Sequence, residues 1–354
     1  MTAGSTILRP RLGSPAMRLL DLGTVPWIRS QSVHHAVAAC FGEGSPDTVV
    51  LVRPDRPYLC VGRHGLGPPP SPAALRRLGL PVVRRRLGGG TVLITPDQTF
   101  YVLVVHRHRL PFPGAASLRW CLGPAVAAYA RLGVPAGVGP GTDVTGAGRK
   151  LCGSGSASLG EASVFGGNVL ADFDPDPFLA ALRVPSAGLR LRLGEELRAQ
   201  MGSVRQATGA IPPPAVVAAA LRHGVEEACD AELRPGSLSA EETAALPAVE
   251  RWLRRRGPAA PPPGCWKVRA GCGVVRLVLD GPPRRVLLLT VRGGAVAGVA
   301  AEDRRAGALA GRLGEVLAGR RLDAVPPAVD GLEAEHAAAV AAALGTARRL
   351  LGVD

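Results

Sequence analysis

Lys150 is the residue of this sequence best suited to chemistry. No other lysine precedes Lys267, and arginine serves nearly everywhere else in the chain. Lys150 stands in the glycine-dense stretch 141–156, whose small side chains allow a ligand to approach closely. Its compact ammonium group can neutralise phosphate and carboxylate oxygens together. The competing interpretation is a surface lysine at the tip of a hairpin.

A second candidate is the loop Gly88-Gly89-Gly90, which follows three arginines and a leucine. Consecutive glycines let the backbone approach a ligand and leave N–H groups free for an anion. If 81–87 is a strand, alternation places Val83, Arg85 and Leu87 on one face. A guanidinium on an apolar face needs a partner, because an unpaired buried charge costs several kcal/mol. We therefore expect an anionic ligand here rather than a simple tight turn.

Cysteines and histidines do not indicate a metal site. The seven cysteines are irregularly spaced, with no C-x-x-C pair, so neither a disulfide framework nor a zinc site is expected and a reducing cytosol fits. His34 and His35 are adjacent, and His106 and His108 share one face of a strand end. No carboxylate stands at metal-site spacing from either pair. We predict no bound metal ligated by protein side chains.

The elements that must position these residues follow from periodicity and from glycine and proline breaks. We expect a strand at 18–22, a helix at 31–41 and a strand at 48–53, followed by a strand at 58–62 and a helix at 73–78. A hairpin of 91–95 with 99–105 is expected next. A helix at 115–132, a strand at 168–172 and helices up to the 230s should follow. The C-terminal part is expected to hold strands at 273–279, 285–291 and 295–300 and helices at 304–317 and 332–351.

Domain organisation follows from length and linker composition. A chain of 354 residues favours one large domain plus a smaller one. We predict a disordered N-terminal extension (1–16), a catalytic domain (17–253), a linker rich in arginine and proline (254–264) and a small C-terminal accessory domain (265–354).

Charge and hydropathy narrow the partner classes. The net charge of +14 favours acidic partners. The arginines are scattered and no basic stretch alternates with aromatic residues, which argues against nucleic acid. The first 16 residues lack the apolar segment of a signal peptide, and no apolar run is long enough to span a bilayer. A soluble, cytoplasmic protein without membrane partners is expected.

Several motifs together resemble the lipoate-protein ligase A family of the biotin/lipoate A/B protein ligase superfamily. Arg84-Arg85-x-x-Gly88-Gly89-Gly90-x-Val92 looks like the family's RRxxGGGxV signature, and Asp143-Val144 with Gly148-Arg149-Lys150-Leu151-x-Gly153-Ser154 resembles its ND…GRKxSGSA segment. Phe165-Gly166-Gly167-Asn168-Val169-Leu170 is similar to hHGTLL, and Ser203-Val204-Arg205 to SVRSRV. Order and spacing agree over about residues 17–235.

The resemblance implies an α/β (α+β) fold: a mixed-sheet biotin/lipoate ligase-type catalytic domain with a small α+β C-terminal accessory domain. It implies ATP-dependent activation of lipoate or octanoate to acyl-AMP, with Mg²⁺, and transfer to a lysine of an acidic acceptor. The acceptors would be lipoyl domains of 2-oxo-acid dehydrogenase acyltransferase subunits or the glycine-cleavage H protein. Lys150 would stabilise the developing charge. The acyl-adenylate would be bound by Arg85, Gly88, Gly89, Gly90, Thr91, Asp143, Gly153, Ser154, Gly167 and Asn168.

Departures from the family pattern keep an alternative open. The family's His-Asp after the glycine loop is missing, and Gly166 replaces the histidine before Gly167. An octanoyl- or lipoyl-transferase of the same fold would take the acyl group from a protein donor through a cysteine thioester, without ATP. Cys152, two residues after Lys150, is the candidate nucleophile, because a nearby cation lowers a thiol pKa. The competing interpretation is that Cys152 fills a tight space. A degenerate relative that only binds is the non-enzyme alternative.

Overall fold

The computed structural model describes residues 16–63, 69–112, 114–255, 264–279, 284–302, 306–323 and 334–353. Contacts divide the chain into two compact units. The first consists of Met1–His64, Leu80–Phe173 and Gly202–Gly257, and the second of Gly65–Gly79, Asp174–Met201 and Pro258–Asp354. Residues 1–15 of the expected extension and 256–263 of the expected linker lie outside the described residues.

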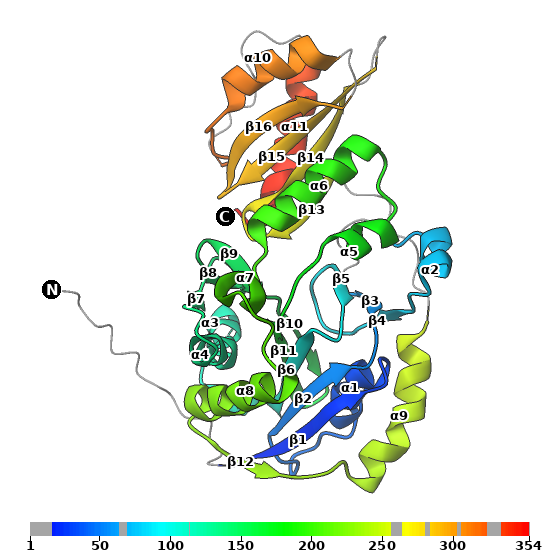
Figure 1. Ribbon diagram of the computed structural model, residues 1–354, viewed down its shortest axis with the longest axis vertical. Coiled ribbons are helices and arrows are strands. Elements are labelled where there is room, and N and C mark those ends of the chain that lie inside the picture. The colour runs from blue at the N-terminus through cyan, green and yellow to red at the C-terminus, as the bar shows by residue number, and fades with distance from the viewer. Residues whose placement is uncertain are drawn as a thin grey trace, which may run out of the picture. The chain divides into compact units, whose positions relative to one another are not determined.

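A mixed six-stranded sheet forms the centre of the first unit (Figure 1). Its strand order is β10 (Gly155–Leu159), β11 (Ala162–Leu170), β6 (Gln98–His106), β2 (Thr48–Pro54), β1 (Ala16–Val25) and β12 (Glu232–Pro235). β1 runs parallel to both of its neighbours, whereas β2, β6, β11 and β10 pair antiparallel. The expected mixed α/β fold is thereby confirmed.

Helices cover both faces of this sheet, so its central strands are apolar on both sides. In β2, Val49 and Leu51 belong to a core with α4 (Gly123–Arg131) and α8 (Pro214–Cys229). Val50 and Val52 belong to a second core with α1 (Arg29–Ala39) and α9 (Ala240–Leu253). Successive side chains of a strand point to opposite faces, so one run of valines serves both cores.

Two small sheets complete the first unit, and most of the candidate residues lie on their strands or on the segments that flank these strands. One has the order β4 (Val82–Arg84), β3 (Tyr58–Val61) and β5 (Thr91–Ile94), and the other has β7 (Gly137–Val138), β8 (Val144–Gly146) and β9 (Arg149–Cys152). The expected hairpin of 91–95 with 99–105 is wrong. β5 pairs with β3, while β6 pairs with β2 and β11 in the central sheet. The buried run of β6 satisfies its backbone on both edges and leaves none for β5.

Two further elements differ from the expected ones in extent. The single helix expected at 115–132 is two helices, α3 (Gly114–Trp120) and α4, because Gly123-Pro124 starts a new helix with proline in its first turn. The strand expected at 168–172 is the end of β11, which begins at Ala162. Short helices α5 (Asp176–Ala181) and α7 (Val204–Thr208) flank the long helix α6 (Ala187–Gln200) in sequence.

The second unit is built on an antiparallel sheet in the order β13 (Cys265–Arg269), β14 (Cys272–Leu279), β15 (Arg285–Arg292) and β16 (Ala295–Ala301). Helices α10 (Gly307–Leu317) and α11 (Ala334–Leu351) bury their apolar side chains against it. α6 and α2 (Pro72–Leu78) are also grouped with this unit, although the sequence placed both in the catalytic domain. Arg292 binds Glu196 of α6 at 2.7 Å, and Arg269 binds Gln200 at 2.7 Å, which ties α6 to the sheet.

No helix in the described ranges has the length and apolarity needed to cross a membrane.

Candidate functional site

Lys150 lies on β9, and a turn with positive φ at Ala147 and Gly148 reverses the chain just before this strand. The turn joins β8 to β9 and sets Lys150 opposite Thr145. The Nζ atom of Lys150 lies 2.6 Å from Oδ1 of Asp143, which directly precedes β8. The lysine side chain is 18% exposed and that of Asp143 is 9% exposed. The ammonium group is therefore held by a nearly buried counter-ion and still reaches solvent.

Arg85 lies directly after β4, and its guanidinium is surrounded by backbone carbonyls. Nη2 donates to Gly88 O at 2.8 Å and to Gly90 O at 3.1 Å, and Nε donates to Gly88 O at 3.2 Å. Nη1 donates to Cys60 O and contacts Cys60 Sγ, both at 3.3 Å. Val83 and Leu87 are buried as the alternation predicted. Carbonyl oxygens of the glycine loop and of β3 therefore partner this charge, and the binding of an anionic ligand by Arg85 stays a prediction.

Glycines are needed where the loop 88–90 meets β3. A β-carbon on Gly62 would collide with the carbonyl oxygen of Gly89, and Gly89 itself has φ of +92°. Gly62 N donates to Gly90 O at 3.1 Å, and Arg63 N donates to Leu87 O at 3.0 Å. The loop is thus fixed by backbone pairing and by Arg85, with no room for larger residues.

The glycine loop and the segment after Lys150 come together in the structure. Gly88 N donates to Ser156 O at 3.0 Å, and a β-carbon on Gly155 would lie 3.1 Å from Gly88 O. Ser154 Oγ donates to Thr142 O at 2.6 Å, next to Asp143. The two constellations that the sequence singled out therefore form one continuous site.

A relay of buried amides braces this site from β11. Asn168 Oδ1 accepts from Gly153 N at 3.0 Å, and Asn168 Nδ2 donates to Gln98 Oε1 at 3.3 Å. Gln98 Nε2 in turn donates to Leu93 O on β5, at 3.1 Å. The relay links the segment after Lys150 to the strand after the glycine loop. Sequence reasoning missed Gln98, although a glutamine at the head of an apolar strand is a signal for such a role.

Tyr129 also supports β9, a role that no sequence pattern predicted. Its hydroxyl donates to Leu151 O and accepts from Leu170 N at 2.9 Å. Tyr129 is fully buried on α4. The carbonyl next to Lys150 is thus tied to the core of the first unit.

Gly167 and Thr91 have local explanations in the fold. A β-carbon on Gly167 would lie 2.6 Å from ring atoms of Tyr101, so this glycine makes room for a buried aromatic ring. Thr91 begins β5 and pairs with Val61, at the end of the glycine loop. Roles of either residue in ligand binding stay predictions.

Cys152 is buried, with no exposed surface. Its Sγ contacts Gly153 O and accepts from Asn168 N, each at 3.3 Å. Desolvation raises the pKa of the Cys152 thiol to about 12, although Asn168 N–H and Lys150 act in the opposite direction. A neutral, enclosed thiol is a poor nucleophile, so the geometry favours the space-filling interpretation.

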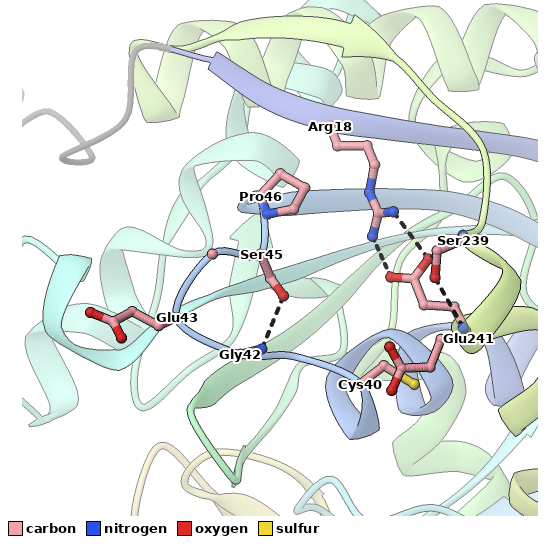
Figure 2. Close-up of a pocket in the computed structure, with 10 residues that line it drawn as sticks. Arg18, Cys40, Gly42, Glu43, Ser45, Pro46, Ser239 and Glu241 are labelled. Carbon is pink, nitrogen blue, oxygen red and sulfur yellow. Dashed lines mark hydrogen bonds and ion pairs between the residues drawn. The ribbon is translucent and has the colours of Figure 1, made fainter.

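A cavity of about 370 Å³ lies in another part of the first unit (Figure 2). None of its lining residues is a predicted site residue, and several of its polar groups bind one another. Figure 2 shows the Ser45 hydroxyl turned to the backbone N–H of Gly42, a hydrogen bond of 2.9 Å. Arg18 is bound to the Glu242 carboxylate at 2.6 Å. The cavity is lined by Arg18, Cys40, Gly42, Glu43, Gly44, Ser45, Pro46, Ser239, Glu241 and Glu242. Among the described residues, no group of three His, Cys, Asp or Glu side chains is arranged to hold a metal ion.

Comparison with solved structures defines the class of fold. A bipartite lipoate protein ligase from Thermoplasma acidophilum superposes with a TM-score of 0.60 at 19% identity, over 70% of this chain and all of that one. A lipoate-protein ligase A bound with ATP gives 0.55 at 19% identity, over 67% of this chain and 94% of that one. The protein has the fold of the lipoate ligases.

The sequence comparisons identify the family. Residues 29–225, more than half of the chain, match the model of the lipoyl protein ligase A/B catalytic domain. The octanoyltransferase LipM of Kyrpidia tusciae is 30% identical over 250 residues, covering 64% of this chain and 91% of its own length. That of Moorella thermoacetica is 26% identical over 267 residues, covering 68% and 98%. The chain belongs to the lipoyl protein ligase A/B catalytic domain family, an enzyme family of lipoylation, and the expected resemblance is confirmed.

Proposed function

We propose that this protein is an octanoyltransferase, which moves an octanoyl group from a thioester on a carrier protein to a lysine of a lipoyl-domain acceptor without ATP. The observation that carries the proposal is the similarity to two octanoyltransferases over nearly their whole length. ATP-dependent ligation was the first expectation from the resemblance. The lipoate-protein ligase A that was solved with ATP is similar in fold only, at 19% identity.

In this proposal, Lys150 acts on the reacting carbonyl. The acceptor amine attacks the thioester carbon, a C–N bond forms, the C–S bond breaks, and the displaced thiolate takes up the proton that the amine loses. The carbonyl oxygen carries negative charge in the tetrahedral intermediate, and an ammonium group stabilises that charge. Asp143, 2.6 Å away, fixes the position of Nζ.

The transfer runs directly from donor thioester to acceptor lysine in this proposal. An acyl-enzyme on Cys152 would require its thiol to lose a proton at a pKa of about 12 and to leave an apolar core shared with Tyr101 and Phe165. Of the seven cysteines, Cys40 is half-buried and six are buried. Cys40 lines the separate cavity of Figure 2.

The test supplies purified protein with octanoyl-acyl-carrier protein and a lipoyl domain, with and without ATP and Mg²⁺. Mass spectrometry should show octanoyl-lipoyl domain at the same rate in both mixtures. Product that requires free octanoate and ATP, with octanoyl-AMP and pyrophosphate released, would instead establish a ligase.

The same assay tests the direct route with Cys152→Ala and Cys152→Ser. Both variants should retain a transfer rate within about threefold of that of the original protein, because each replaces a packing residue with one of similar volume. A stable acyl-enzyme in the original protein, together with loss of transfer in Cys152→Ala, would show that the thioester route is correct.

A further inference from the structure

Helix α1 carries a cluster of buried polar side chains beneath the glycine loop. Ser30, Gln31, His34 and His35 are each at most 5% exposed. Buried polar groups destabilise a fold unless they find hydrogen-bond partners. Ser30 Oγ and Gln31 Nε2 both bond the hydroxyl of Tyr58 on β3, at 2.9 Å. The helix is therefore joined by side-chain hydrogen bonds to the strand that also contacts Arg85.

His35 makes the contact that matters for the loop. Its Nε2 lies 3.1 Å from the backbone N of Arg86, and its Nδ1 lies 2.7 Å from Gln31 O. A backbone N–H can only donate, so Nε2 must be the acceptor, and the ring proton stands on Nδ1 and is donated to Gln31 O. Burial lowers the pKa of His35 to about 4, so the ring is neutral near pH 7, and its two hydrogen bonds select this tautomer.

Arg86 is the residue next to the one that holds the glycine loop. Its guanidinium stacks on Trp252 of α9, 4.5 Å from the ring centroid. Arg85 N donates to Val61 O at 2.9 Å, while the Arg85 guanidinium holds the carbonyls of Gly88 and Gly90. The backbone N–H of Arg85 is thus held by β3, and that of Arg86 is held by His35 of α1.

We infer that His35 is a positioning residue for the glycine loop: by accepting the Arg86 N–H, it sets the backbone from which Arg85 reaches the carbonyls of Gly88 and Gly90. Its consequence for acyl transfer rests on the proposed function, but the positioning itself does not. His35 acts through Arg86 and touches no reacting atom.

His34 is the matched control within the same cluster. It is 2% exposed and its ring lies 4.3 Å from that of His35. Neither of its ring nitrogens has a hydrogen-bond partner among the described residues. A change at His34 therefore alters the packing of α1 without removing a hydrogen bond to the loop.

The experiment compares His35→Phe, His35→Gln and His34→Phe by amide hydrogen exchange of peptides covering residues 84–90, together with the acyl-transfer assay. His35→Phe should speed exchange in these peptides about tenfold, as expected for the loss of one buried hydrogen bond. Its KM for the octanoyl donor should rise more than its kcat falls, because the loop is misplaced while Lys150 is untouched. His35→Gln retains an acceptor at similar reach and should restore exchange to within about threefold. His34→Phe should match the original protein.

Unchanged exchange at 84–90 in His35→Phe would overturn the inference, and so would an equal effect of His34→Phe or the absence of rescue by His35→Gln. If the original protein transfers no octanoyl group but the exchange pattern follows this order, the proposed function fails and the positioning role stands. If His35→Phe does not fold, His35→Leu, which also lacks an acceptor, takes its place: faster exchange at 84–90 than in His35→Gln supports the inference, and equal exchange in the two variants overturns it.

Discussion

Arg85 and Lys150 belong to the two halves of one site, and their charges are used differently. Five hydrogen-bond contacts from Arg85 go to groups of 60–90, four of them to backbone carbonyls. Lys150 has a carboxylate 2.6 Å away and keeps part of its side chain in solvent. Arginine, with several donors in a fixed plane, can hold several carbonyls at once, whereas a lysine ammonium is a compact charge on a flexible chain. The arginine holds the glycine loop in place, and the lysine ammonium keeps partial access to solvent.

Of the variants that test this difference between Lys150 and Arg85, Lys150→Ala should have the largest effect on activity. We expect kcat/KM for octanoyl transfer to fall about 10²- to 10³-fold, the range for loss of a group that stabilises an oxyanion. Lys150→Arg should keep the ion pair with Asp143 but recover little activity, because the broad guanidinium cannot replace a compact ammonium. Steady-state assays measure both.

The control is Lys267→Ala, which removes an exposed lysine of the second unit and should leave the rate unchanged. If the activity of Lys150→Ala stayed within about threefold of the original, the lysine would have no role in the acyl-transfer step. The proposed difference between Lys150 and Arg85 would then be wrong.

Arg85→Gln tests the structural half. Loss of the Arg85 guanidinium leaves the carbonyls of Cys60, Gly88 and Gly90 without their hydrogen-bond donor. We therefore expect the free energy of unfolding to fall by about 2–4 kcal/mol. Urea denaturation measures the change. Arg84→Gln is the neighbouring control, since the Arg84 guanidinium makes one exposed hydrogen bond, to Arg63 O. An Arg85→Gln variant of normal stability but low activity would mean that Arg85 contacts the substrate after all.

Gln98→Leu tests the relay that connects the two halves. Asn168 Nδ2 and Leu93 O would lose their partner in a buried setting, so we expect a loss of about 1–3 kcal/mol in unfolding free energy. A double-mutant cycle with Asn168→Leu should show coupling of about 1 kcal/mol. Gln206→Leu, on an exposed helical position, is the control. Strict additivity in the cycle would show that the relay contributes nothing as a unit.

The general fold could be predicted because it depends on side-chain patterns. Val49 to Val52 alternate between two cores, and such a run of apolar residues indicates a strand covered on both faces. The hairpin of 91–95 with 99–105 failed for a related reason. Two neighbouring strands suggest mutual pairing, whereas the partners of β6 lie about 50 and 60 positions away along the chain.

The site could be predicted only in part. Glycine density and a single lysine indicated both halves, and the spacing of the motifs indicated the family. The partners of Arg85 are carbonyl oxygens, which every residue carries, so no residue type announces them. The contact of Asn168 with Gln98 joins residues 70 positions apart, and that of Tyr129 with Leu151 again uses a backbone oxygen. Tertiary placement, not local pattern, creates these bonds.

The smallest expected effect concerns pH and the histidines beneath the Arg85 half. Burial lowers the pKa of His35 to about 4 and that of His34 well below its usual value, with Arg85 contributing to both shifts. In the unfolded chain a histidine titrates near 6.5, so below that pH the unfolded state binds more protons than the folded state, and stability is lost as pH falls. Between pH 7.5 and 5.5 we expect unfolding free energy to fall by about 1 kcal/mol for each buried histidine. The His34→Phe/His35→Gln double variant should lose that part of the slope in urea titrations. Lys150 lies outside this cluster, so Lys150→Ala should keep the original slope of unfolding free energy against pH. A flatter slope in Lys150→Ala would instead show that the pH-sensitive groups lie in the Lys150 half of the site.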